Sequence, residues 1–330
     1  MNTMRLIMAL AALSGRPIRL SSVAAPDDDP DSIRLHVESA DQIKPGRSAR
    51  AYRGIVYAAP ARKLRMDILT PQAPGPYPLV LYLPGGGFVT ARRAMAARQR
   101  HCVAQAGFAV ASIDYRTVRD GATYLDGLAD VAAALSFLRL HADHYGINPA
   151  RTALWGESAG GYLAAMAATD PGSGVAAVTG SGVDAVIDVF GASHLATIAD
   201  GFDPATVTAY TTTGAALPTY LLGPGRAFAD HPAEVINADP ASHITSETPP
   251  FLLLHGSDDR IVTPAQTARL HQALRRADVD STRYVLQGAG HGALSSAPRI
   301  WTSTQVMAII VNFLRSRLGV TPESDNKAST

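Results

Sequence analysis

Cysteine is almost absent from this sequence, because Cys102 is the single thiol in 330 residues. One thiol cannot form a disulfide within the chain, and it also excludes metal sites built from several cysteines. Cys102 stands among Val103, Ala104 and Ala106. We therefore expect it to be a small core side chain in a helix.

An excess of charge of either sign is absent too. The 29 Lys and Arg residues are balanced by 28 Asp and Glu residues, for a net charge of +1, and the basic residues are dispersed along the chain. Proteins that bind nucleic acid or anionic membrane surfaces concentrate positive charge on one face. The sequence therefore predicts neither partner.

No apolar run approaches the roughly 20 residues that a membrane-spanning helix requires, so we expect a soluble protein without an integral membrane segment. Leu6–Leu13 is a short apolar run, and Ser22–Ala24 has the small residues of a signal-peptide cleavage site. Arg16 and Arg19 lie between the two, where a signal peptide carries no charge. We expect a cytoplasmic protein; the alternative is a secreted or periplasmic one, if the apolar run is a signal peptide.

Composition divides the chain into three parts. Residues 1–48 are expected to form an N-terminal extension and linker, with an acidic, turn-rich stretch at 24–32. Residues 49–320 are expected to form one folded domain, and residues 321–330 a polar tail. Length alone suggests about two domains, but large α/β folds often run this long as one.

Strand-like and helix-like segments alternate through residues 49–320. Leu64–Leu69 alternates apolar and polar residues, as a half-buried strand does. Leu79–Leu83 and Phe108–Ile113 are short apolar runs, which are typical of a parallel sheet covered on both faces. Further strands are expected at Thr152–Trp155, Ala185–Phe190, Phe251–His255 and Arg283–Leu286. Helices are expected at Arg92–Ala106, Tyr124–Tyr145, Ser158–Ala168, Pro264–Ala277 and Pro298–Leu318. This alternation predicts an α/β fold with a mostly parallel central sheet and helices on both faces.

Residues 192–248 interrupt the alternation. They are rich in Thr, Ala, Gly and Pro and contain no convincing strand pattern. A segment of this length inside a compact domain usually has a function. We expect it to be a lid or cap insertion.

The pentapeptide Gly156–Gly160, with sequence GESAG, follows an apolar strand and opens a helix of small residues. This context is typical of a nucleophile elbow, a tight turn that raises a serine hydroxyl above a sheet. The turn strains the serine backbone, and glycines on either side avoid collisions with the neighbouring strand and helix. The pattern predicts Ser158 as a nucleophile. The adjacent Glu157 is expected to have a structural role.

A serine hydroxyl is a weak nucleophile, so it requires a base and a group that orients the base. His291 occupies a glycine-rich turn after the last expected strand, which predicts that it is the base. Asp258 and Asp259 follow the strand that ends at His255, and spacing alone does not separate them as the orienting acid. His255 itself is expected to have a structural role, with its ring bonded to nearby backbone.

Pro84–Phe88, with sequence PGGGF, directly follows an expected strand. Backbone N–H groups in such a glycine run can approach a ligand closely and stabilise an oxyanion. Asp114 and Arg116 follow another central strand, and we expect them to hold loops together through ion pairs.

These motifs together resemble the α/β-hydrolase superfamily, in particular its hormone-sensitive-lipase-like and feruloyl-esterase-like carboxylesterases. The resemblance covers roughly residues 50–318, and it also rests on Tyr145–Pro149 and on Val262 and Pro264 after Asp259. It implies Ser158 as nucleophile, His291 as base and Asp259 as acid, because the acid of this family stands three residues after a His-Gly glycine and three before a valine. It also implies that the backbone N–H groups of Gly86, Gly87 and Ala159 form the oxyanion hole.

The sequence departs from the family pattern at two positions. Pro84 replaces the histidine that usually begins the glycine run, so whatever that ring tethers must be held otherwise. His194 stands where a related segment usually carries aspartate, which affects local loop bonding or substrate contacts.

The resemblance implies hydrolysis of a small-molecule carboxylic ester through an acyl-enzyme, without a metal or organic cofactor. The insertion has few aromatic residues and no long amphipathic helix suited to lipid surfaces, which favours short-chain or small aromatic acyl esters. Two alternatives are an amidase or peptidase with the same triad, such as an arylformamidase, and a noncatalytic binding protein of the same fold. The sequence leaves a homo-oligomer open.

Overall fold

The computed structural model describes residues 29–37, 41–44, 49–180, 182–294 and 297–321. The expectations for Leu6–Leu13, for the Ser22–Ala24 cleavage pattern and for the tail beyond residue 321 lie outside these residues. In the part of the chain that the structure covers, no helix is both long enough and apolar enough to cross a membrane.

Nine strands of the described residues form one sheet, in the order β1-β9-β8-β7-β6-β4-β5-β3-β2. Neighbours pair in parallel from β1 to β5, whereas β3 runs antiparallel to both β5 and β2. The strands are β1 Ile33–Leu35, β2 Ala49–Ala58, β3 Leu64–Pro71, β4 Tyr77–Leu83, β5 Ala109–Ile113, β6 Ile147–Glu157, β7 Ala185–Val189, β8 Phe251–Gly256 and β9 Ser281–Leu286. The expectation of a mostly parallel α/β sheet is confirmed.

The central strands are buried on both faces because apolar side chains alternate between two cores. Along β4, Leu79, Leu81 and Leu83 join one core, and Val80 and Tyr82 join the other. This explains why these strands read as continuous apolar runs in the sequence.

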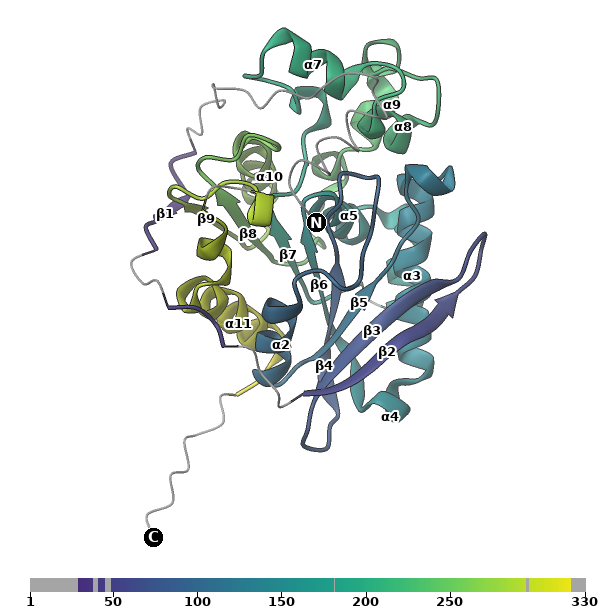
Figure 1. Cartoon of the computed structure of the whole chain (residues 1–330), viewed down its shortest axis with the longest axis vertical. Coiled ribbons are helices and arrows are strands. Elements are labelled where there is room, and N and C mark those ends of the chain that lie inside the picture. The colour runs from purple at the N-terminus through teal and green to yellow at the C-terminus, as the bar shows by residue number, and fades with distance from the viewer. Residues whose placement is uncertain (1–28, 38–40, 45–48, 181, 295–296, 322–330) are drawn as a thin grey trace.

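Helices cover both faces of the sheet (Figure 1). On one face pack α3 (Tyr124–Leu140), α5 (Ala159–Thr169), α6 (Val175–Thr179) and α10 (Ala265–Arg276). On the other pack α2 (Ala97–Gln105) and α11 (Thr304–Leu318). The short α4 (Ala142–Tyr145) continues from α3 and ends at Gly146 in the left-handed conformation. Cys102, in α2, is half-buried and packs against the second core.

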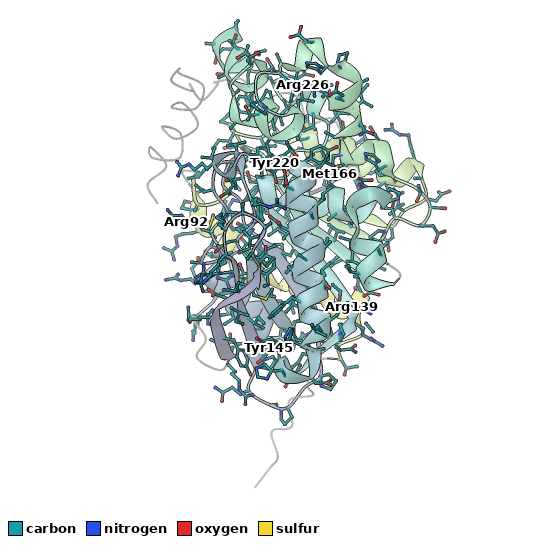
Figure 2. All side chains as sticks on the ribbon, turned by 90° about the vertical axis from the view of Figure 1, so that its right-hand side faces the viewer. Arg92, Arg139, Tyr145, Met166, Tyr220 and Arg226 are labelled. Atoms are coloured by element: carbon teal, nitrogen blue, oxygen red, sulfur yellow. The ribbon has the colours of Figure 1, made fainter. Side chains whose placement is uncertain are left out.

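The insertion at 192–248 contains no strand among its residues, as expected. It folds into α7 (Pro204–Thr211), α8 (Ala216–Leu222) and α9 (Pro232–Asn237), with one short 3₁₀ turn before α7, one between α8 and α9 and one after α9. In Figure 1 these helices lie together at the top of the molecule. Figure 2 shows Arg226 in the outer part of the insertion and Tyr220 nearer the sheet, where its ring stacks on Phe88 at 5.0 Å between centroids.

Two strands at the sheet edges were not predicted. β2 was missed because its long exposed edge lacks the apolar run of a central strand. The linker expected at 24–32 is wrong for its described part, since Asp29 is buried and β1 follows directly and pairs with β9. Whether residue 49 marks a domain boundary stays a prediction.

Two predicted helices are shorter than expected. Residues 93–96 form a turn, because Arg93 is held by ion pairs with Asp67 and Asp114. Helix α2 begins only after Ala96, which is left-handed. The last helix is divided at Ser303, whose hydroxyl accepts the backbone N–H of Val306 and so caps α11.

Candidate active site

Ser158 lies at the turn between β6 and α5. Its backbone has φ 55° and ψ −120°, a conformation that non-glycine residues rarely adopt. The Ser158 N–H donates to the Val189 carbonyl at 2.9 Å, and the Ser158 carbonyl accepts the first helical N–H, from Tyr162, at 3.0 Å. The strained residue is therefore fixed between a neighbouring strand and the helix that it begins.

The glycines around Ser158 are required by close backbone contacts. A Cβ on Gly156 would lie 2.0 Å from the Gly160 carbonyl oxygen, and a Cβ on Gly160 would lie 2.0 Å from that of Leu83. No side chain fits at either position unless the backbone moves. The strand and the helix can approach so closely only because both residues are glycine.

The structure brings Ser158, His291 and Asp259 together, although 133 positions separate the first two. His291 Nε2 lies 2.8 Å from Ser158 Oγ, and His291 Nδ1 lies 2.7 Å from Asp259 Oδ2. Since a carboxylate accepts, Nδ1 carries the proton and Nε2 is free to receive one from the serine. Asp258 instead bonds to Ser257 Oγ at the surface.

Asp259 is fully buried, yet its carboxylate is well stabilised. Its Oδ1 accepts the backbone N–H groups of Ile261 at 2.9 Å and Val262 at 3.0 Å. Burial alone would raise the pKa of Asp259, but the charge of His291 and the N–H of His255 outweigh it and lower the pKa. Asp259 is thus a carboxylate at neutral pH.

The glycine run lies beside Ser158 and is tethered from a segment that follows β5. The buried Tyr115 hydroxyl donates to the Pro84 carbonyl at 2.8 Å, and the Val118 N–H donates to that of Phe88 at 3.0 Å. These bonds hold the loop although Pro84 replaces the usual histidine. No pattern in the sequence indicated this role for Tyr115, because its partner is a main-chain carbonyl 31 residues away.

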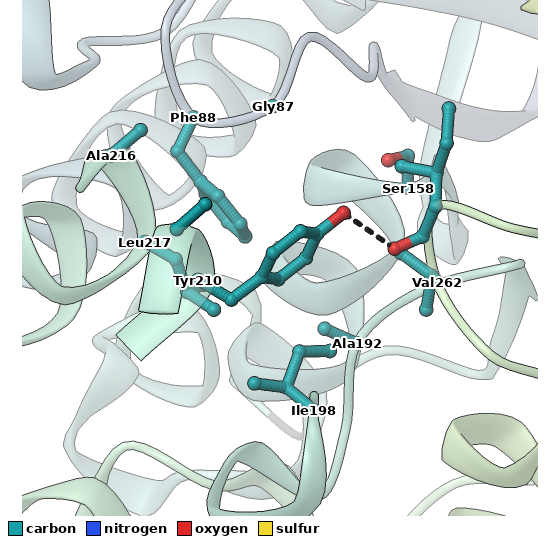
Figure 3. A pocket seen from close by; sticks show the side chains of 11 residues that line it. Gly87, Phe88, Ser158, Ala192, Ile198, Tyr210, Ala216, Leu217 and Val262 are labelled. Carbon is teal, nitrogen blue, oxygen red and sulfur yellow. Dashed lines mark hydrogen bonds between the residues drawn. The ribbon is translucent and has the colours of Figure 1, made fainter. Parts of the chain in front are cut away.

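A small cavity of about 60 Å³ opens beside Ser158 on the side of the insertion (Figure 3). Its walls are apolar and include Phe88, Ile198 and Leu217. Tyr210 also lines it, and its hydroxyl donates to the Ile261 carbonyl at 2.8 Å, the dashed line in Figure 3. This bond ties the insertion to the loop that carries Asp259.

A second cavity, of about 560 Å³, is also lined by Ser158 and in addition by His291. Residues from the α2 region and from the segment before α11, such as Met95 and Trp301, form much of its wall. Glu157 also lines it, and burial raises the pKa of Glu157 to about 7, although the charges of His291 and Arg100 oppose the rise. The walls from the α2 region and from the segment before α11 were not predicted, because no local pattern marks which helix faces a cavity.

Several other polar side chains near the site hold loops in place. Asp114 pairs with Arg93 at 2.6 Å, and Arg116 pairs with Asp126 and Asp130, each at 2.8 Å. The loop at His194 is held by the buried Gln266 side chain, whose amide oxygen accepts the His194 N–H at 2.9 Å. The expectation that Asp114 and Arg116 hold loops together through ion pairs is confirmed.

The described residues contain no group of three His, Cys, Asp or Glu side chains placed to hold a metal ion. The four segments that carry the candidate site follow β4, β6, β8 and β9. All four end at the same edge of the parallel sheet, which is where ligands bind in open α/β folds.

A profile of the BD-FAE family matches residues 66–274. The chain belongs to the BD-FAE family. Its α/β-hydrolase fold is shared by a truncated carbohydrate esterase from gut microbiota, with a TM-score of 0.70 and 23% identity over 84% of this chain and 99% of that one. The thermophilic esterase Est2 of Thermogutta terrifontis has a TM-score of 0.66 and 22% identity, over 84% and 96% of the two chains. The resemblance drawn from the sequence is confirmed.

Two curated relatives are similar in sequence. Esterase LipC of Mycobacterium tuberculosis is 29% identical over 72% of this chain and 58% of its own length. A probable isoprenylcysteine alpha-carbonyl methylesterase, ICMEL1 of Arabidopsis thaliana, is 26% identical over 72% of this chain and 50% of its own. The chain thus spans about half the length of the curated relatives it matches.

Proposed function

We propose that this protein is a serine hydrolase of carboxylic esters that works through an acyl-enzyme. The observation that carries the proposal is the hydrogen-bonded series Ser158, His291 and Asp259 beside a glycine loop. The relatives reported above are named as esterases, which favours an ester over the amide alternative. A catalytically inert binding protein would not need the strained backbone of Ser158.

In the first half of the reaction, His291 Nε2 takes the Ser158 proton as the Oγ attacks the ester carbonyl. The N–H groups of Gly86, Gly87 and Ala159 stabilise the oxyanion, and His291 gives the proton to the leaving alkoxide oxygen, which departs as the alcohol. Water then adds to the acyl group with His291 as base. The serine regains its proton and the acid leaves.

The position of His291 indicates which part of the ester each cavity binds. The leaving oxygen must lie within reach of His291 Nε2 to be protonated, so the alcohol part occupies the large cavity that His291 lines. The acyl part then occupies the small apolar cavity. About 60 Å³ suits a short acyl chain, whereas about 560 Å³ is within the range of small-molecule sites.

The names of the relatives describe two kinds of ester, and this assignment favours one of them. A methylesterase releases methanol, the smallest alcohol, from a larger acid. An acylated carbohydrate carries its bulk on the alcohol side. The cavities of this protein favour the second arrangement, a short acyl group on a bulky alcohol.

A pair of isomeric alkyl esters tests the proposal. 2-Phenylethyl acetate has its bulk in the alcohol, and methyl 3-phenylpropanoate has the same atoms with the bulk in the acid. We expect kcat/KM for the acetate to exceed that for the methyl ester by about tenfold or more, the discrimination that pocket size typically provides. Comparable values, or a preference for the methyl ester, would reverse the cavity assignment.

The variant Ser158→Ala tests the nucleophile independently of the cavity assignment. We expect it to lower kcat for both esters by about 10⁴-fold or more, and to abolish labelling by a fluorophosphonate probe. Full activity of this variant would refute the nucleophile, whatever the wild-type protein prefers. Circular dichroism and a thermal unfolding curve serve to check that the variant is folded.

A further inference from the structure

A second histidine contacts the carboxylate of Asp259. The ring of His255, fully buried at the end of β8, places Nε2 3.3 Å from Asp259 Oδ2, the oxygen that also accepts from His291. The same Nε2 lies 2.9 Å from the Val262 carbonyl. A carbonyl can only accept a hydrogen bond, so Nε2 carries a proton and shares it between Val262 and Asp259.

The other ring nitrogen of His255 is held by a hydroxyl. Nδ1 lies 2.8 Å from the Oγ1 of Thr267, which is buried on α10. Arg283 Nε donates to the same Oγ1 at 3.0 Å. Since a guanidinium only donates, the threonine hydroxyl accepts from Arg283. Because Nε2 of His255 carries that ring's proton, Nδ1 accepts, and it is the nearer acceptor for the threonine proton, with the Pro264 carbonyl farther away at 3.3 Å. The bonds therefore run in one direction, from Arg283 through Thr267 and His255 to Asp259.

Arg283 begins this series on the strand next to the edge of the sheet. It lies on β9, is fully buried, and donates through Nη2 to the Pro264 carbonyl at 2.8 Å. Its Nη1 donates to Ser32 Oγ at 2.6 Å and lies 3.9 Å from the carboxylate of Asp29, which is also buried. A buried cation requires such partners. Asp29 and Ser32 immediately precede β1, which lies beside β9 in Figure 1.

We propose that His255 is a positioning residue for Asp259, and that the segment Asp29–Leu35 supports it through Arg283 and Thr267. The inference rests on the proposed function, because it concerns the same acid. The His255 N–H fixes Oδ2 so that this oxygen faces His291, and the backbone N–H groups of the Asp259 loop fix Oδ1. Residues 29–35 touch no substrate, yet they thus contribute to the position of His291, the base.

Other charged and titratable groups surround this series of bonds. They are His291 and Tyr210 near Asp259, and Asp31, His271 and Arg275 near Arg283 and Asp29. The test below leaves all of them in place.

Thr267→Val tests the proposal, with Thr267→Ser as its matched control. Valine keeps the volume of threonine and removes the hydroxyl, whereas serine keeps the hydroxyl and removes a methyl group. Loss of one hydrogen bond corresponds to about fivefold in rate. We expect Thr267→Val to lower kcat about fivefold with KM within about twofold, and Thr267→Ser to stay close to wild type. If Thr267 matters only for packing, serine is the worse substitute, and that order of the two variants would overturn the proposal.

The pH profile gives a second readout. When the His255 N–H is less well oriented, Asp259 becomes a stronger base and favours the protonated form of His291. The acid limb of kcat/KM is therefore expected to move to higher pH in Thr267→Val and to stay in place in Thr267→Ser. An unmoved or lowered limb in the valine variant would overturn the proposal.

A measurement without substrate keeps the two proposals distinguishable. The proton between His291 Nδ1 and Asp259 should give a downfield ¹H NMR resonance, identified by its loss in His291→Ala. We expect this resonance to shift in Thr267→Val but not in Thr267→Ser. An identical resonance in wild type and Thr267→Val would overturn the positioning role. If instead it shifts while the wild-type protein hydrolyses no ester, the proposed function fails and the positioning role stands.

Discussion

The serine at the elbow shows how much of the site is decided within a few residues. Ser158 needs glycines two positions away on either side, because a Cβ there would overlap backbone atoms. Those glycines are visible in the sequence, so Ser158 was predictable as a candidate nucleophile from local pattern alone. Spacing did not separate Asp259 from Asp258; only the family resemblance implied Asp259, and the packing of the loop decides which carboxylate turns inward.

Asp188, on β7 beneath the nucleophile helix, is a buried carboxyl with one bonded oxygen. Its Oδ1 accepts the Gly191 N–H at 2.9 Å, and burial raises its pKa to about 7. A carboxyl whose pKa is raised on folding stabilises the fold below its unfolded pKa of about 4 and loses that contribution as pH rises towards 7.

Asp188→Asn should therefore change stability in a pH-dependent way. The amide stays neutral, so the variant gains on the wild type by on the order of 3 kcal/mol between pH 4.5 and pH 8. Thermal unfolding at the two pH values measures the gain. A difference between Asp188→Asn and the wild type that stays constant between the two pH values would contradict the prediction.

At the scale of elements, the central strands and most helices were predicted because burial on both faces imposes an apolar pattern. The edge strands β1 and β2 escaped prediction because half-exposed strands lack it. The helix expected from Arg92 begins five residues late because Arg93 is held by carboxylates on β3 and after β5. Ion pairs between distant segments override local helix propensity, and no window of sequence contains them.

The short helix α8 sets the size of the small cavity through Leu217. Leu217→Ala enlarges this cavity, so longer acyl chains should fit. We expect the ratio of kcat/KM for p-nitrophenyl hexanoate to that for the acetate to rise about tenfold, the typical effect of a few methylenes in an apolar pocket.

Leu222→Ala, in the same helix, is the matched control. Leu217 and Leu222 are equally buried, each with 7% of its surface exposed, but only Leu217 lines the cavity. The control should lose stability without changing the ratio. An equal change of the ratio in both variants would mean that α8 acts through stability and not through cavity size.

At the scale of the whole molecule, the segment before β1 is joined to the sheet by buried charge. Asp29→Ala removes a buried carboxylate from Ser32 and from the neighbourhood of Arg283. We expect the free energy of unfolding to fall by about 2 to 3 kcal/mol, because the buried guanidinium loses compensation. Urea denaturation measures the change.

An exposed ion pair provides the comparison. Asp200 lies 3.4 Å from Arg269 and has 53% of its side chain exposed. Asp200→Ala should lower the free energy of unfolding by less than about 1 kcal/mol, since water screens such pairs. Equal losses in the two variants would show that the buried charge of Asp29 does not join this segment to the sheet.

The sequence by itself determined the α/β alternation, the turn at Ser158 and the glycine loop, because each depends on residues close together in the chain. It predicted His291 as the base from a glycine-rich turn after the last expected strand. The tertiary structure decided between Asp258 and Asp259, which spacing had left open. It alone showed how the loop at Pro84 is held, where the two cavities lie, and that Arg283, Thr267 and His255 connect the segment before β1 to Asp259. Those features depend on side chains and carbonyls from segments tens to hundreds of residues apart. Their positions are fixed only when the strands stack side by side and bring their ends to one edge.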